Sequence, residues 1–207
     1  MAWAPDYLID DEFSEYEWIT DDIDSEQLGW AITTASRAVD DFTNRQFGKA
    51  DAPEQLRYTP KWNRRKGRWS IVVEDLQDLT GLAVHLDLDG DDLFTDVVTG
   101  TVLKLPLNAA AKGRPYEQLV LPESVNGTLC GADGEVAVTS IPGWNAIPVS
   151  IKQGTALQAS RLVARRAAPF GIAGSPEAGS EMRLLAKLDP DVQLIVKGFW
   201  RPKAGVR

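Results

Sequence analysis

The sequence predicts an α+β protein: a helical scaffold of two long helices plus a short C-terminal helix, with a large antiparallel β insertion between the two long helices. Two observations predict it. Apolar residues recur at helical spacing near both ends of the chain, and strand-like alternation fills the middle. With 207 residues, of which 43% are apolar, the chain can bury the core of one ordinary domain.

We therefore expect residues 1–207 to form a single domain. Its expected parts are an acidic N-terminal arm (1–24), the helical scaffold (25–47 and 148–200), the β insertion (55–145) and a flexible tail (201–207).

The first long helix is expected over residues 25–47. Asp24 or Ser25 can cap its first turn, and Gly48 follows its end. Its apolar stripe, at spacings of three and four, consists of Leu28, Ile32, Ala35, Val39 and Phe42.

Strand patterns run from residue 56 to residue 141. "RYTPKW" and "RWSIVV" flank the polar turn "NRRKG", and "TVLKLPL", "EQLVLP" and "GEVAVTSI" follow later. "GLAVHLDL" alternates strictly, which predicts that Leu82, Val84, Leu86 and Leu88 share one face of a strand. Asp89-Gly90 then predicts a hairpin turn.

Two more helices are expected after the β-type region. Pro148 suits the first position of a helix that runs to Arg166, in which Gly154 and Ala156 permit close packing. The last helix is short, with Asp189 as its N-cap and Pro190 at its first position.

Charge is distributed unevenly along the chain, whose net charge is −8. Residues 1–26 contain ten acidic residues and no basic one, whereas residues 149–207 carry a net charge of +6. This asymmetry suits a subunit that meets another head to tail, and equally an acidic, partly mobile arm. The candidates for an acidic arm or a channel-lining surface are Asp10, Asp11, Glu12, Asp89, Asp91 and Asp92.

The residues needed for most catalytic sites are missing from the sequence. A single cysteine (Cys130) and a single histidine (His85) exclude zinc-ligand spacing, and any Ser-His-Asp arrangement would depend on His85. A calcium loop starting at Asp87 lacks the required Gly and Glu at its sixth and twelfth positions. We expect no enzyme, no metal and no cofactor. A metal-dependent hydrolase with Asp87, Asp89 and Asp91 as ligands is a third hypothesis.

The start of the chain has no signal-peptide pattern, and no apolar run is long enough to cross a membrane. We expect a soluble protein that is made in a reducing cytoplasm and binds no membrane.

The segment "KWNRRKGRW" (61–69) interleaves cations with two tryptophans. Such a cluster can bind nucleic acid, and it can equally bind an acidic protein surface, such as the N-terminal arm of this chain itself. The simplest interpretation is an exposed hairpin tip. A nucleic-acid-binding β-module that uses residues 61–69 remains the alternative function.

Three segments resemble the head-to-tail connector (adaptor) proteins of long-tailed bacteriophages. They are "ASRAVDDFTNRQF" (35–47), "VAVTSIPGWNAIPVSIKQGTALQASRLVARR" (136–166) and "LDPDVQLIVKGFWR" (188–201), and the strand-rich segment "LPLNAAAKGRPYEQLVLP" is also similar. The resemblance spans residues 25–201. Compact members of that family are mainly helical, so the long β-type region here is a departure from the pattern.

The resemblance implies a structural virion protein at the head-tail junction, made in the cytoplasm of a host bacterium. Its partners would be further copies of itself in a ring, expected to be a dodecamer, together with the portal protein and a stopper or tail-terminator protein. Genomic double-stranded DNA would pass through the lumen. The candidates for the interface with the portal, a neighbouring subunit or the tail are Lys61, Arg64, Arg65, Lys66, Arg68, Trp69, Asp189, Phe199, Trp200 and Arg201.

Overall fold

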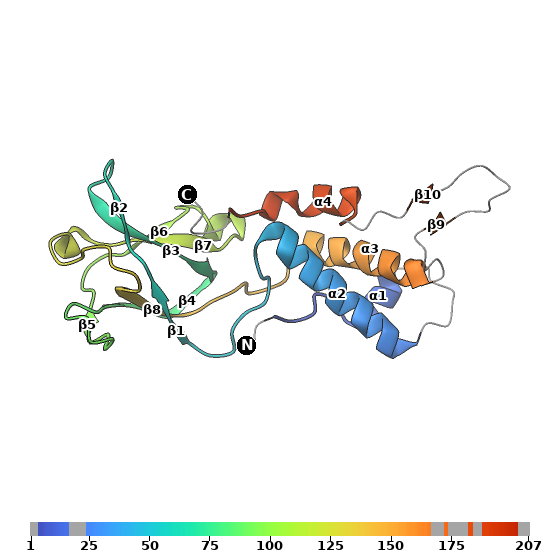
Figure 1. The fold of residues 1–207 in the computed structure, drawn as a ribbon, viewed down its shortest axis with the longest axis horizontal. Helices are drawn as coiled ribbons and strands as arrows, with labels where there is room; N and C mark the ends of the chain where they lie inside the picture. Colours follow the sequence, from blue (N-terminus) through green and yellow to red (C-terminus); the bar gives the residue numbers. More distant parts are fainter. Residues whose placement is uncertain (1–3, 17–23, 167–171, 174–181, 184–187, 203–207) are drawn as a thin grey trace. The chain divides into compact units, whose positions relative to one another are not determined.

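A computed structural model describes residues 4–16, 24–166, 172–173, 182–183 and 188–202 (Figure 1). The chain divides into two compact units. The β unit comprises Gly48–Ala146 together with Met1–Ala4, and the helical unit comprises Pro5–Phe47 together with Ile147–Arg207.

The β unit contains two antiparallel four-stranded sheets. One has the order β1-β8-β4-β5 and the other the order β2-β3-β7-β6. The strands are β1 (Glu54–Tyr58), β2 (Lys61–Asn63), β3 (Arg68–Leu76), β4 (Asp78–Leu86), β5 (Asp96–Val97), β6 (Leu103–Leu105), β7 (Tyr116–Val120) and β8 (Val136–Ile141). The short 3₁₀ helices η1 (Ala110–Lys112) and η2 (Glu123–Val125) lie in the connections.

Both sheets contribute to one hydrophobic core. Strand β3 buries Trp69, Ile71 and Val73, and from Ile71 to Val73 it follows the period-two pattern of a half-buried strand, with Val72 exposed. Leu119 of β7 and Val138 of β8 are fully buried in the same cluster. The β unit is therefore held together by large apolar side chains from two sheets.

The expected fold class, a helical scaffold with a β insertion, is wrong. The protein is α+β, but one long helix precedes the strands, and the strands form two four-stranded sheets around a core of their own. The prediction treated the strands as an insertion that depends on the helices. The strands instead carry enough inward-facing Ile, Leu and Val for the two sheets to bury each other's apolar faces.

The ends of the β unit are clasped together by a close backbone contact. Trp144 N donates to Gly48 O at 2.9 Å, and Ala50 N donates to Pro142 O at 2.9 Å. Gly143 lies at the tightest point with φ 120°, and a Cβ atom there would lie 2.2 Å from Gly48 O. Only glycine fits this position.

The loop before β8 closes around its own acidic residue. Glu135 is buried, and its carboxylate accepts hydrogen bonds from the backbone N–H groups of Cys130 (2.8 Å), Gly131 (2.7 Å) and Ala132 (3.0 Å). These amides form a concave anion-binding site of the kind that consecutive N–H groups create, and the chain fills it from within.

The helical unit consists of α1 (Asp10–Tyr16), α2 (Ser25–Thr43), α3 (Val149–Arg166), α4 (Pro190–Val196) and the 3₁₀ turn η4 (Lys197–Phe199). Helix α2 packs on α3, and α3 packs on α4. A Cβ atom at Gly154 would lie 2.9 Å from Val196, and Ala156 is buried where α2 and α3 meet, so the expected close packing is confirmed.

The expected helix caps are confirmed at two N-termini. Asp24 accepts from Glu26 N at 3.3 Å, and Asp189 accepts from Asp191 N at 2.8 Å, with Pro190 at the start of α4. Helix α2 is shorter than expected because it ends at Thr43, where Asn44 adopts the left-handed conformation (φ 52°).

Beyond these elements, β9 (Ile172–Ala173) and β10 (Met182–Arg183) form a short antiparallel pair. None of the described helices is both long enough and apolar enough to cross a membrane.

Candidate protein-binding surfaces

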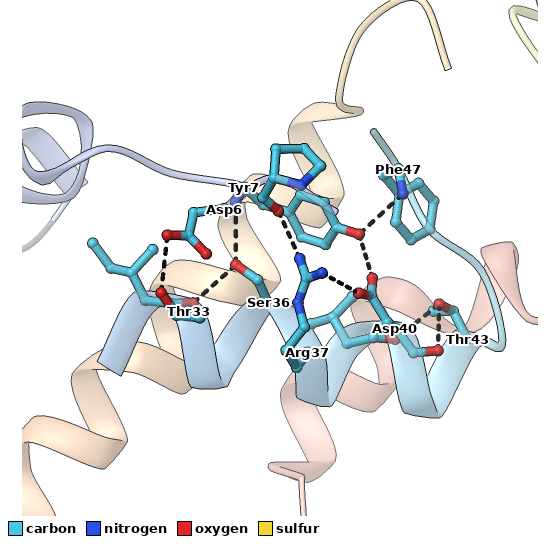
Figure 2. A network of polar contacts seen from close by, with 11 residues as sticks. Asp6, Tyr7, Thr33, Ser36, Arg37, Asp40, Thr43 and Phe47 are labelled. Carbon is cyan, nitrogen blue, oxygen red and sulfur yellow. Dashed lines mark hydrogen bonds and ion pairs between the residues drawn. The ribbon is translucent and has the colours of Figure 1, made fainter. Parts of the chain in front are cut away.

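The start of the chain is anchored on α2 through Tyr7 (Figure 2). The Tyr7 hydroxyl donates to the Asp40 carboxylate and accepts from Phe47 N at 3.0 Å. Tyr7 N donates to the Ser36 hydroxyl at 3.1 Å, and Arg37 donates to Pro5 O at 2.6 Å. Residues 5–13 of the expected mobile arm are thus part of the packed helical unit.

The anchor contains a perturbed carboxyl group. Burial raises the pKa of Asp40 to about 6, against the opposing effects of the Tyr7 hydrogen bond and the Arg37 charge. The second carboxylate oxygen of Asp40 lies 3.3 Å from an Arg37 nitrogen but accepts no hydrogen bond within the described residues. Burial and the neighbouring Asp40 also raise the pKa of Tyr7 well above its usual value, so its hydroxyl stays protonated and can donate.

An acidic hollow of about 420 Å³ lies beside this anchor on the helical unit. We use the name "acidic hollow" for the surface lined by Asp6, Leu8, Ile9, Asp10, Asp11, Gly29 and Ile32. Thr33 holds the Asp6 carboxylate at 2.9 Å, and Ser25 holds that of Asp10 at 2.9 Å. Ile9 is 61% exposed, and Trp30, next to Gly29, is 65% exposed. The hollow combines fixed carboxylates with exposed apolar side chains.

The basic segment 61–69 forms the β2–β3 hairpin. Its turn is tight: Lys66 N donates to the Asn63 side chain at 3.1 Å, and Gly67 N donates to Asn63 O at 2.8 Å. We call Arg64, Arg65 and Lys66, all exposed in this turn, the basic turn.

The two tryptophans of this hairpin differ in exposure. Trp69 is a core residue, 9% exposed, and packs edge to face on Trp62, which is 43% exposed. Lys61 is exposed, and Arg68 pairs with Glu123 at 2.6 Å. The hairpin therefore offers one tryptophan, not two, to a partner.

The acidic loop after β4 is longer than the expected tight turn. Strand β4 ends at Leu86, and its partner β5 begins only at Asp96. Between them the Asp87 carboxylate accepts hydrogen bonds from Gly90 N (2.8 Å) and Asp92 N (3.1 Å), which fold the chain into a wider loop. Leu88, expected on the apolar face, lies beyond the strand and is 46% exposed.

Three carboxylates of this loop lie close together. One oxygen each from Asp87, Asp89 and Asp91 lies within 4.8 Å of the others, and the Asp91 charge raises the pKa of Asp89. Asp92 points to Arg57 instead, at 2.6 Å.

The remaining interface candidates lie in the helical unit. Asp189 caps α4 and pairs with Arg161. Phe199 packs edge to face on Phe47, with ring centroids 5.5 Å apart, and Arg201 N donates to Thr43 O at 2.9 Å. Trp200, by contrast, is 56% exposed. Of the acidic candidates on α1, Asp11 is exposed and Glu12 pairs with Lys152 at 2.5 Å.

His85 lies on β4 opposite Val97 and Ala137 and is half-buried. Its Nδ1 atom is buried and has no hydrogen-bond partner among the described residues, so they provide no carboxylate to orient the ring as in a catalytic triad.

Sequence reasoning missed the hollow and its apolar edge. Its signal in the sequence was weak: Tyr7 and Leu8 are two adjacent large residues in an acidic stretch. Both of these arm residues are buried.

Comparison with known proteins adds no relative to this picture: no family model matches the chain, and no curated protein sequence matches it significantly.

Proposed function

We propose that the chain is a structural subunit of a ring that connects the portal of a long-tailed bacteriophage to its stopper or tail. In this proposal the ring, a dodecamer, extends the DNA channel at the head-tail junction and carries no catalytic activity. The partners are further copies of the chain, the portal protein, the stopper or tail-terminator protein, and the DNA that passes through the lumen.

The observation that supports this role best is the C-terminal segment. Helix α4 is fixed by the Asp189 cap, and its Val192 and Val196 side chains are fully buried, with Val196 against Gly154 of α3. Yet Leu194 is 74% exposed and Trp200 is 56% exposed. A rigid segment that turns a large leucine and a tryptophan outward suits a docking element, because preorganised apolar anchors dominate protein interfaces.

The test uses portal particles of the phage that encodes the chain. We expect negative-stain microscopy of portal particles mixed with the purified protein to show a ring of added density at the portal. Portal particles that stay bare, together with the absence of the chain from purified virions by mass spectrometry, would contradict the function.

Variants locate the docking element. Leu194→Ser and Trp200→Ser should each lower the affinity for portal particles at least tenfold without changing the free energy of unfolding. The matched control is Leu107→Ser, which removes another highly exposed leucine (64%) from the β unit. An equal loss of affinity in all three variants would refute docking through α4.

The alternative, a nucleic-acid-binding β-module, draws on the exposed cations of the basic turn. It is weakened by the burial of Trp69, which leaves one exposed ring for base stacking, and by a net charge of −8, which repels phosphate. An acidic protein surface is a better match for this turn.

A further inference from the structure

The basic turn is a rigid, uncompensated group of cations. Asn63 holds it from one side, and the Asn126 side chain donates to Gly67 O at 2.9 Å from the other. Within the described residues, Arg64, Arg65 and Lys66 make no ion pair, whereas the neighbouring Arg68 is paired with Glu123. Three positive charges therefore stand on a fixed scaffold with Trp62 beside them.

The acidic hollow carries charges of the opposite sign that are unpaired among the described residues. Asp6, Asp10 and Asp11 make no ion pair with any described residue, and two of them are held in place by hydroxyl groups of α2. A volume of about 420 Å³ lies within the range of ~300–1,000 Å³ that is common for binding pockets. Ile9, which lines the hollow and is 61% exposed, adds apolar surface to it.

We propose that the basic turn of one copy of this chain docks in the acidic hollow of a second copy. Arg64, Arg65 and Lys66 would face Asp6, Asp10 and Asp11, three charges against three. The guanidinium fork matches carboxylate oxygens in pairs, and Trp62 supplies an apolar partner for Ile9. This contact would form the lateral joint of the ring, a biological setting that rests on the proposed function.

The second copy is favoured over nucleic acid because the protein carries both halves of the contact. A contact between two different surfaces is heterologous, so a dimer still has one free turn and one free hollow. Addition of copies then closes a ring or extends a filament. Exposed charges across the joint are screened within about 8 Å at physiological ionic strength, so association should weaken steeply with salt.

The experiment is a charge exchange in the full chain, followed by sedimentation velocity at low and high salt. One variant reverses the turn (Arg64→Glu, Arg65→Glu, Lys66→Glu), and another reverses the hollow (Asp6→Lys, Asp11→Lys) but keeps Asp10 at the start of α1. Each should lose self-association at least tenfold. A mixture of the two should recover it, because the acidic turn of the first fits the basic hollow of the second, and the reverse pairing also fits.

Controls carry the same charge changes elsewhere: Lys112→Glu and Asp51→Lys, both exposed in the β unit, should leave association unchanged. The single variants Arg65→Glu and Asp11→Lys replace exposed side chains without ion-pair partners among the described residues, and they keep the test valid if a multiple variant fails to fold. Each should weaken association about threefold or more.

Three results would overturn the contact. The first is self-association that neither charge reversal changes, and the second is a mixture of the two variants that does not recover self-association. The third is that reversal of the turn abolishes salt-sensitive DNA binding and leaves self-association unchanged. The outcomes are separable from the proposed function. If the protein binds portal particles but its self-association does not respond to the charge reversals, only this contact is refuted. If its self-association responds to the reversals but it does not bind portal particles, only the connector role is refuted.

Discussion

The two units of this protein are built on different kinds of core. In the β unit, large side chains from two sheets, such as Ile71, Leu119 and Val138, fill one interior. Where α2 meets α3, half of the eight buried cluster residues are alanines, and Leu8 and Phe13 come from the first residues of the chain. The helical unit also leaves Trp30 and Leu194 outside.

The difference shows what each unit needs. Burial of apolar area scales with side-chain size, so the cluster in the β unit buries more apolar area per residue than the alanine-rich contact between α2 and α3. The helical unit depends on close backbone approach, on a polar anchor at Tyr7 and on an N-terminal segment. The β unit also leaves large apolar side chains exposed, such as Trp62 and Leu107, so both units offer surface to a partner.

The largest effect should come from breaking the clasp of the β unit. Gly143→Ala places a Cβ atom 2.2 Å from Gly48 O, against backbone that cannot move aside. We expect a loss of about 3 kcal/mol or more in the free energy of unfolding, measured by urea denaturation. Hydrogen exchange should assign the loss to residues 48–146.

The matched control for the clasp is Gly127→Ala, where a Cβ atom meets nothing within 4 Å. Its effect should stay within about 0.5 kcal/mol. Equal effects at the two glycines would show that the clasp does not hold the β unit together.

A smaller effect should follow from loosening the polar anchor of the helical unit. Tyr7→Phe removes the hydroxyl that joins Asp40 to Phe47 N, so both of these hydrogen bonds are lost. We expect a loss of about 1–3 kcal/mol by urea denaturation, with faster hydrogen exchange in α2. Tyr116→Phe is the control, since the Tyr116 hydroxyl makes no hydrogen bond with a described residue; a loss as large there would contradict the anchor role.

The smallest effect is a pH dependence that arises from Asp40 in the helical unit. The pKa of Asp40 is raised from 3.8 to about 6, so between these values the native state holds a proton that the unfolded chain has released. This contribution is complete below about pH 4 and is lost as the pH rises through 6. Asp40→Asn should remove up to about 2 kcal/mol of that pH dependence.

Urea denaturation from about pH 4.5 to about pH 7 measures the effect, and Asp51→Asn, at an exposed site in the β unit, should leave the slope unchanged. An unaltered slope in Asp40→Asn would assign the pH dependence to other carboxylates.

Local signals in the sequence predicted the individual elements well. The stripe on α2, the caps at Asp24 and Asp189 and the alternation on β4 act over a few residues, so they can be read directly. The pairing of the strands could not be predicted, because alternation predicts which face of a strand is buried but not which other strand lies beside it or packs on it.

The candidate surfaces were predictable only in part. The basic turn follows from "NRRKG", but Trp69 of the same hairpin is buried in the core together with Ile71, two positions along β3. The acidic hollow required tertiary information: dense negative charge in residues 1–26 suggested a solvated arm, whereas Tyr7 and Leu8 bury themselves against α2.

The Glu135 loop of the β unit has a kinetic consequence. Every hydrogen bond that its carboxylate accepts comes from a residue three to five positions earlier. The two sheets, by contrast, must join strands far apart in the chain, such as β1 with β8. Closing a loop of this size takes on the order of 10–100 ns, far less than non-local strand pairing. The turn that leads into β8 can therefore be in place before the strands on either side of β8 arrive.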